Sequence, residues 1–216
     1  MGEAEDLYRL FPEHITRTGN NFTRAEQLVA MHSLINELAN RVAETTYPGA
    51  DDILRSAVVF IHATLEDFLR NIAFDFLPRE ENGFVAKLPL AGKERSASYK
   101  MEDLLRHRGK TVDQVVDESI NQWLNRHSFN NADQISALLR DLRLPTEPME
   151  CYFGELDKMI KRRHKIVHDA DLPQREGATP DEITPETVKG WCRNTNDFAV
   201  CVLRQLKLLD NGTNNA

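Results

Sequence analysis

Cysteine is scarce in this sequence, and the cysteines present form no redox or metal-binding motif. Cys151, Cys192 and Cys201 are odd in number and include no CxxC pair. This pattern excludes a disulfide-rich secreted domain and is typical of a protein of the reducing cytoplasm. We therefore expect the cysteines to be small buried side chains rather than reactive thiols.

Long hydrophobic runs are also missing. The longest apolar run, AVVFIHATL at residues 57–65, is far shorter than the roughly 20 residues that a membrane-spanning helix needs. The first residues, MGEAEDLYRLF, have neither the basic start nor the apolar stretch of a signal peptide. The sequence therefore predicts no membrane partner and a cytoplasmic location.

Positive charge is in deficit over the chain as a whole. Lys and Arg number 27 against 34 Asp and Glu, so the formal net charge is −7. This balance excludes a global field that attracts nucleic acid or an anionic membrane. A local basic cluster would have to hold any anionic ligand. One such cluster exists, because KMIKRRHKIVHDADLP at residues 158–173 begins with closely spaced lysines, arginines and histidines.

Strand-like alternation, glycine-rich phosphate loops and GxSxG motifs are absent, and most of the sequence has the apolar period of α-helices. The broadest apolar stripe lies at about 52–77, which we expect to be the central helix, with Asp51 or Asp52 as its N-cap. Further helices are predicted at 22–45, 100–107, 111–127, 131–142 and 149–167, and from Thr184 onward. The sequence thus predicts an all-α, single-domain helical bundle.

The breaks between the helices predict how the chain is divided. We expect residues 1–21 to be an N-terminal lead, residues 22–210 to be the helical domain and residues 211–216 to be a disordered tail. Residues 77–98 are rich in Pro, Gly, Ser and charge and have no clear period. They predict a long, mobile loop after the central helix.

The basic cluster falls on a predicted helix, and most of its charges lie on one face. On a helical wheel, Lys158, Lys161, Arg162 and Lys165 lie opposite the apolar residues. A solvated outer face accounts for these four side chains, with a supporting role in attracting a polyanion.

Arg163 differs from its neighbours because it falls in the middle of the apolar stripe of the same helix. A guanidinium does not lose its proton and is costly to bury without a partner. One interpretation is an ion pair with an internal carboxylate, for which Glu66 and Asp67 on the central helix are candidates. The other is a cleft in which Arg163 faces an anionic ligand. The helical period leaves both open.

His164 and His168 are four residues apart and are therefore neighbours on a helix. This spacing also suits two zinc ligands, but no HExxH glutamate and no Cys/His pair completes a metal site. Arg163 and His168 would point about 140° apart on a straight helix. A site shared by both needs the helix to bend or end by His168, or needs two chains. The following DADLP favours an ending.

The stretch RHKIVH at residues 163–168 resembles the signature of the HEPN superfamily, R-x4–6-H with a polar residue after the arginine. Arg163, His164 and His168 match the arginine, the polar residue and the histidine. SAVVFIHATLEDFLRNIA is similar to the early long helix of the superfamily. Together with TVDQVVDESI and SFNNADQISALL, it makes the chain most similar to the RiboL-PSP-associated HEPN group, over roughly residues 50–210.

The resemblance implies an α-helical bundle and, for many members, a metal-independent endoribonuclease of toxin–antitoxin, phage-defence or RNA-processing systems. In such an enzyme the ribose 2′-hydroxyl attacks the adjacent phosphate and leaves a 2′,3′-cyclic phosphate. His168 would transfer a proton, and Arg163 would bind the phosphate. His164 would be an orienting group or a second proton-transfer group. The resemblance implies no cofactor.

The resemblance also implies partners. RNA would be the substrate, with Lys161, Arg162 and Lys165 holding flanking phosphates. Paired motifs of HEPN proteins usually meet at a dimer interface, which implies a homodimer with a composite site. An antitoxin or another operon partner protein is a further candidate.

Two other functions remain open on the sequence alone. A non-catalytic HEPN-like module that binds RNA or a protein would use the same basic cluster and Arg163. A metalloprotein would instead use His164 and His168. Incubation of labelled RNA with the protein, with and without EDTA, separates the three.

Overall fold

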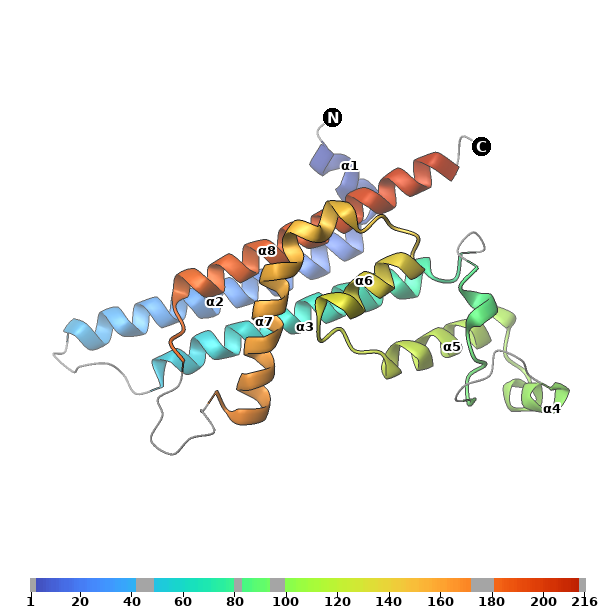
Figure 1. The fold of residues 1–216 in the computed structure, drawn as a ribbon, viewed down its shortest axis with the longest axis horizontal. Helices are drawn as coiled ribbons and strands as arrows, with labels where there is room; N and C mark the ends of the chain where they lie inside the picture. The colour runs from blue at the N-terminus through green and yellow to red at the C-terminus, as the bar shows by residue number, and fades with distance from the viewer. Residues whose placement is uncertain (1–2, 42–48, 80–82, 94–99, 172–180, 214–216) are drawn as a thin grey trace.

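The computed structural model describes residues 3–41, 49–79, 83–93, 100–171 and 181–213 (Figure 1). Within these ranges the chain forms helices and connecting segments and no β-strand, which confirms the predicted all-α class. The elements in chain order are α1 (Glu3–Leu10), α2 (Pro12–Arg41), α3 (Ala50–Phe76), η2 (Val85–Lys87), α4 (Met101–Leu104), η3 (Leu105–His107), α5 (Val112–Arg126), α6 (Ala132–Asp141), η4 (Glu147–Met149), α7 (Glu150–Asp169) and α8 (Pro185–Thr213).

Helix α3 is the centre of the bundle, as its broad apolar stripe predicted. It packs against α2, α5, α7 and α8. Its side chains Leu54, Ile61, Leu69 and Ile72 have no solvent-exposed surface. Figure 1 shows α2 and α8 extending along the long axis of the molecule, while α7 crosses α3 steeply and ends beyond it. This crossing brings the predicted motif helix against the central helix.

Residues 3–21 of the expected N-terminal lead form α1 and the start of α2 and contribute to the core. Leu7 and Phe11 are almost completely buried, and the rings of Phe11 and Phe76 lie 6.1 Å apart. Packing of Phe11 against the end of α3, and of α1 against α2 and α8, therefore explains the apolar residues of this lead. At the other end of the chain α8 extends to Thr213, and residues 214–216 lie outside the described part.

The described part of the connection after α3 is attached to α5. The ring of Phe84 packs edge-on against Trp123 at 4.9 Å, and the Ala91 N–H donates to the Ser119 hydroxyl at 2.9 Å. These contacts correct the prediction of a mobile loop for residues 83–93. The segment has no regular apolar period, but apolar contacts and side-chain hydrogen bonds attach it to α5. Residues 80–82 and 94–99 of the predicted loop lie outside the described part.

The helices predicted to begin at residue 111 and at Thr184 have side-chain caps at these positions, whereas the predicted N-cap of the central helix is wrong. The hydroxyl of Thr111 accepts the N–H of the third residue of α5, and the hydroxyl of Thr184 does the same in α8. For α3 the prediction was wrong, since the N-cap is Gly49, with φ of 93°. Asp51 and Asp52 instead lie in the first turn, where their charges still favour the positive helix end.

The cysteines only partly match the prediction of buried thiols. Cys192 and Cys201 are buried, whereas Cys151 is exposed at the start of α7. Burial raises the pKa of Cys192 to about 11, so that thiol stays protonated at neutral pH. Among the helices of the described residues, none is both long and apolar enough to cross a membrane.

Candidate functional site

The three motif residues lie near the C-terminal end of α7, which is a continuous helix from Glu150 to Asp169. The predicted ending exists, but it follows His168 and leaves the helix regular between Arg163 and His168. Their side chains therefore leave the helix about 140° apart. Within one chain, the end of α7 does not turn the two side chains toward each other.

The two histidines form a pair on the solvent-facing side of α7. The ring centroids of His164 and His168 are 4.3 Å apart, and both side chains are exposed. Among the described residues, no group of three His, Cys, Asp or Glu side chains is arranged to hold a metal ion. The two imidazole rings therefore form a pair open to solvent, beside Val167, which is also exposed.

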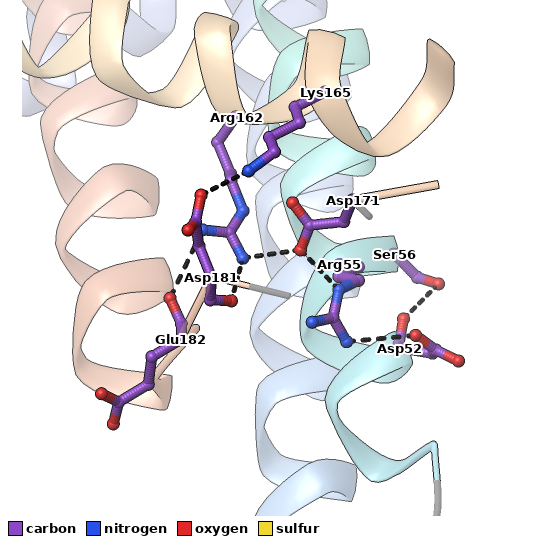
Figure 2. Close-up of polar contacts among 8 residues, drawn as sticks. All are labelled: Asp52, Arg55, Ser56, Arg162, Lys165, Asp171, Asp181 and Glu182. Carbon is purple, nitrogen blue, oxygen red and sulfur yellow. Dashed lines mark hydrogen bonds and ion pairs between the residues drawn. The ribbon is translucent and has the colours of Figure 1, made fainter. Parts of the chain in front are cut away.

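Arg162 does not lie on a free outer face, which corrects the interpretation of the basic cluster. Its side chain is 13% exposed, and its Nη2 donates to Asp171 Oδ2 at 2.6 Å and to the carbonyl of Asp181 at 2.6 Å (Figure 2). Its Nη1 also donates to the carbonyl of Glu182. The segment that leads into α8 covers this face of α7, so the guanidinium binds protein groups instead of solvent.

The two lysines predicted beside it differ from each other. Lys165 donates to the carboxylate of Asp181, and this hydrogen bond, together with the lysine charge, lowers the pKa of Asp181 (Figure 2). Lys161 is exposed, and no carboxylate of the described residues lies within ion-pair distance of it. Of the predicted RNA-binding cations, Lys161 is therefore the one that the described contacts leave available to a phosphate.

Arg163 faces inward, as the wheel predicted, and lies half-buried. Its Nε is buried without a hydrogen-bond partner, and among the described residues no carboxylate forms an ion pair with it. Asp67 binds Arg17 instead, through two contacts of 2.6 Å, and Glu66 Oε2 lies 3.8 Å from His62 Nδ1. The ion pair of Arg163 with Asp67 that the sequence allowed is thus not formed.

His62 of the central helix α3 is a neighbour of Arg163. Its side chain is 1% exposed on α3. Burial is the main cause that lowers the pKa of His62; the Glu66 carboxylate opposes this effect, and the positive charge of Arg163 lowers the pKa further. Arg163 therefore lies beside the uncharged imidazole of His62, and Glu66 lies next to the same imidazole.

Asp171 is a second residue that the helical period could not identify. It follows the C-terminus of α7 and has no exposed surface. Besides Arg162, it accepts a hydrogen bond from Arg55 Nε at 2.7 Å, so it connects the motif helix to the start of α3 (Figure 2). In the sequence, Asp171 marked only the end of the basic run.

The sequence that carries this site matches a known protein family. A family model described as RiboL-PSP-HEPN matches residues 20–207, which is most of the chain and includes the whole of α7. The chain belongs to the RiboL-PSP-HEPN family. The resemblance carried by RHKIVH is thereby confirmed, and so is the HEPN-type all-α fold. No curated protein and no solved structure matches the chain.

The extent of the match changes how α2 is understood. The resemblance in the sequence began near residue 50, whereas the RiboL-PSP-HEPN match begins at residue 20, inside α2. The match therefore includes α2 from residue 20 onward. HEPN domains are often associated with RNA.

Proposed function

We propose that this HEPN protein is a metal-independent endoribonuclease. The observation that carries the proposal is the contrast between two adjacent arginines of α7. Arg162 is bound by Asp171 and two carbonyl groups, whereas Arg163 has no anion among the described residues. A half-buried guanidinium without an internal counter-ion is suited to an anion that arrives from outside, and a phosphate supplies one.

The proposed chemistry uses the nucleophile that RNA carries. The ribose 2′-hydroxyl loses its proton and attacks the adjacent phosphorus, and the 5′-oxygen of the next nucleotide leaves with a proton. The products are a 2′,3′-cyclic phosphate and a free 5′-hydroxyl. Arg163 binds two phosphate oxygens through its planar fork and stabilises the charge that develops on them.

Proton transfer is assigned to His168, with His164 as the orienting or second proton-transfer group. Imidazole suits this task because its ordinary pKa lies near neutral, and such transfer contributes about 10²–10⁴-fold to a rate. The exposure of both rings supports contact with a substrate. Lys161 is proposed to hold a flanking phosphate, which brings RNA to one place on an acidic protein.

A homodimer is part of the same proposal. Arg163 and His168 diverge on one helix, so a second α7 is needed to put an arginine and a histidine on the same phosphate. Val167 lies between them in the sequence and is 50% exposed, which supports its burial against a partner copy. Two copies related by a two-fold axis would form the composite cleft.

Dilution tests the dimer. We expect specific activity to fall as the protein is diluted below its dissociation constant, in step with the dimer fraction seen by sedimentation velocity. The variant Val167→Glu introduces two like charges across the proposed interface and should shift the equilibrium to monomer. A monomer that keeps full specific activity at every concentration would contradict the composite site.

Incubation with end-labelled RNA tests the activity itself. We expect cleavage by the purified protein to be the same with and without excess EDTA. Binding of RNA without cleavage would favour a non-catalytic HEPN-like binding module, and cleavage that EDTA abolishes would favour a metal-dependent enzyme. A toxin or phage-defence role in the cytoplasm, with an antitoxin or operon partner, is the biological setting that we propose from the HEPN resemblance.

A further inference from the structure

Asp171, Arg55 and Arg162 form a buried cluster, here named the Asp171 clamp, that joins three parts of the fold. Asp171 follows α7, Arg55 belongs to α3, and Arg162 lies inside α7 and also reaches the carbonyls that precede α8 (Figure 2). The aspartate has no exposed surface and both arginines are 13% exposed. Solvent screening of this cluster is therefore weak.

The backbone at the clamp adopts a conformation that needs support. Ala170 and Asp171 have φ values of 51° and 60°, which are unfavourable for residues with a Cβ atom. Both amides donate to the carbonyl of Lys165 and end the helix. Two such residues in succession persist when the surrounding contacts fix them, and they concentrate at functional sites.

The charges of the clamp make Asp171 its central group. Both arginines donate to the same atom, Asp171 Oδ2, while Oδ1 has no partner among the described residues. The other carboxylate in contact, Asp52, is 74% exposed and 3.1 Å from Arg55 Nη1. Without Asp171, two nearly buried guanidinium groups would lack a buried anion and would move apart or toward solvent.

We propose that Asp171 is a positioning residue for the endoribonuclease site. It fixes the C-terminal end of α7, whose last turn carries His168 and whose preceding turn carries His164, against α3. It also holds Arg162 away from the substrate, so that the neighbouring Arg163 is the arginine presented to the phosphate. This inference rests on the proposed function for its kinetic consequence, but the structural consequence is independent of it.

The test uses Asp171→Asn in the full-length protein, which keeps the shape of the side chain and removes its charge. We expect kcat for RNA cleavage to fall about 10²-fold with KM little changed, because small displacements of reacting groups have effects of this size. Amide hydrogen exchange should accelerate at residues 166–171 while the buried part of α3 stays protected. The matched control is Asp52→Asn, an exposed carboxylate on the same arginine, with an expected change of less than about two-fold.

The outcomes separate the clamp from the proposed function. If the parent protein cuts no RNA, the proposed function fails, and selective exchange at residues 166–171 still supports the clamp. Unchanged exchange there, or exchange that rises equally throughout the chain, overturns the positioning role. If Asp171→Asn does not fold, Arg55→Lys takes its place, since it keeps the charge and loses the Nε donor. The same selective exchange and the same fall in kcat are expected.

Discussion

Replacement of Arg163 by alanine is expected to lower RNA cleavage by about 10²–10³-fold without loss of helix content. The rate falls because a donor to the developing phosphate charge is removed. Stability should stay equal or rise, since the variant removes a half-buried charge that has no internal anion. Cleavage rates, circular dichroism and the urea midpoint are measured on the same preparation.

Arg162→Ala is the matched control for that variant, because it removes the same group one position earlier. Here we expect the free energy of unfolding to fall by about 1.5–3 kcal/mol, since hydrogen bonds to the buried Asp171 and to two carbonyls are lost. A stable Arg163→Ala variant that cuts RNA like the parent would refute the assignment. Unfolding of Arg163→Ala would instead favour an internal structural role for that arginine.

A substrate with 2′-deoxyribose at the cut position is expected to resist cleavage entirely. The 2′-hydroxyl is the proposed nucleophile, and no other group of the site replaces it. The same oligonucleotide with the deoxyribose one nucleotide away should be cut at the parental rate. Mass spectrometry of the products of all-RNA substrate should find 2′,3′-cyclic phosphate ends. Efficient cleavage of all-DNA substrate would exclude this mechanism.

The local features of this chain could be read from its sequence. The apolar period of residues 52–77 predicted the central helix α3, and Thr111 and Thr184 predicted two helix starts, because periodicity and capping act within a few residues. The wheel also placed Arg163 on the inward face of α7. The pattern RHKIVH pointed to the HEPN family, which the match over residues 20–207 confirmed.

Tertiary structure decided which charges are free. In the sequence Arg162 and Lys165 looked like a solvated face, and Asp67 was a candidate partner for Arg163. In the fold Arg162 donates a hydrogen bond to Asp171, and Arg17 forms an ion pair with Asp67. Helical period fixes the direction of a side chain relative to its own helix. It does not predict which residues of α2, or of the turn after α7, contact that side chain in the folded protein. Ion pairs between residues far apart in sequence depend on the tertiary fold, and among the described residues they bind Arg162 and leave Arg163 without a carboxylate partner.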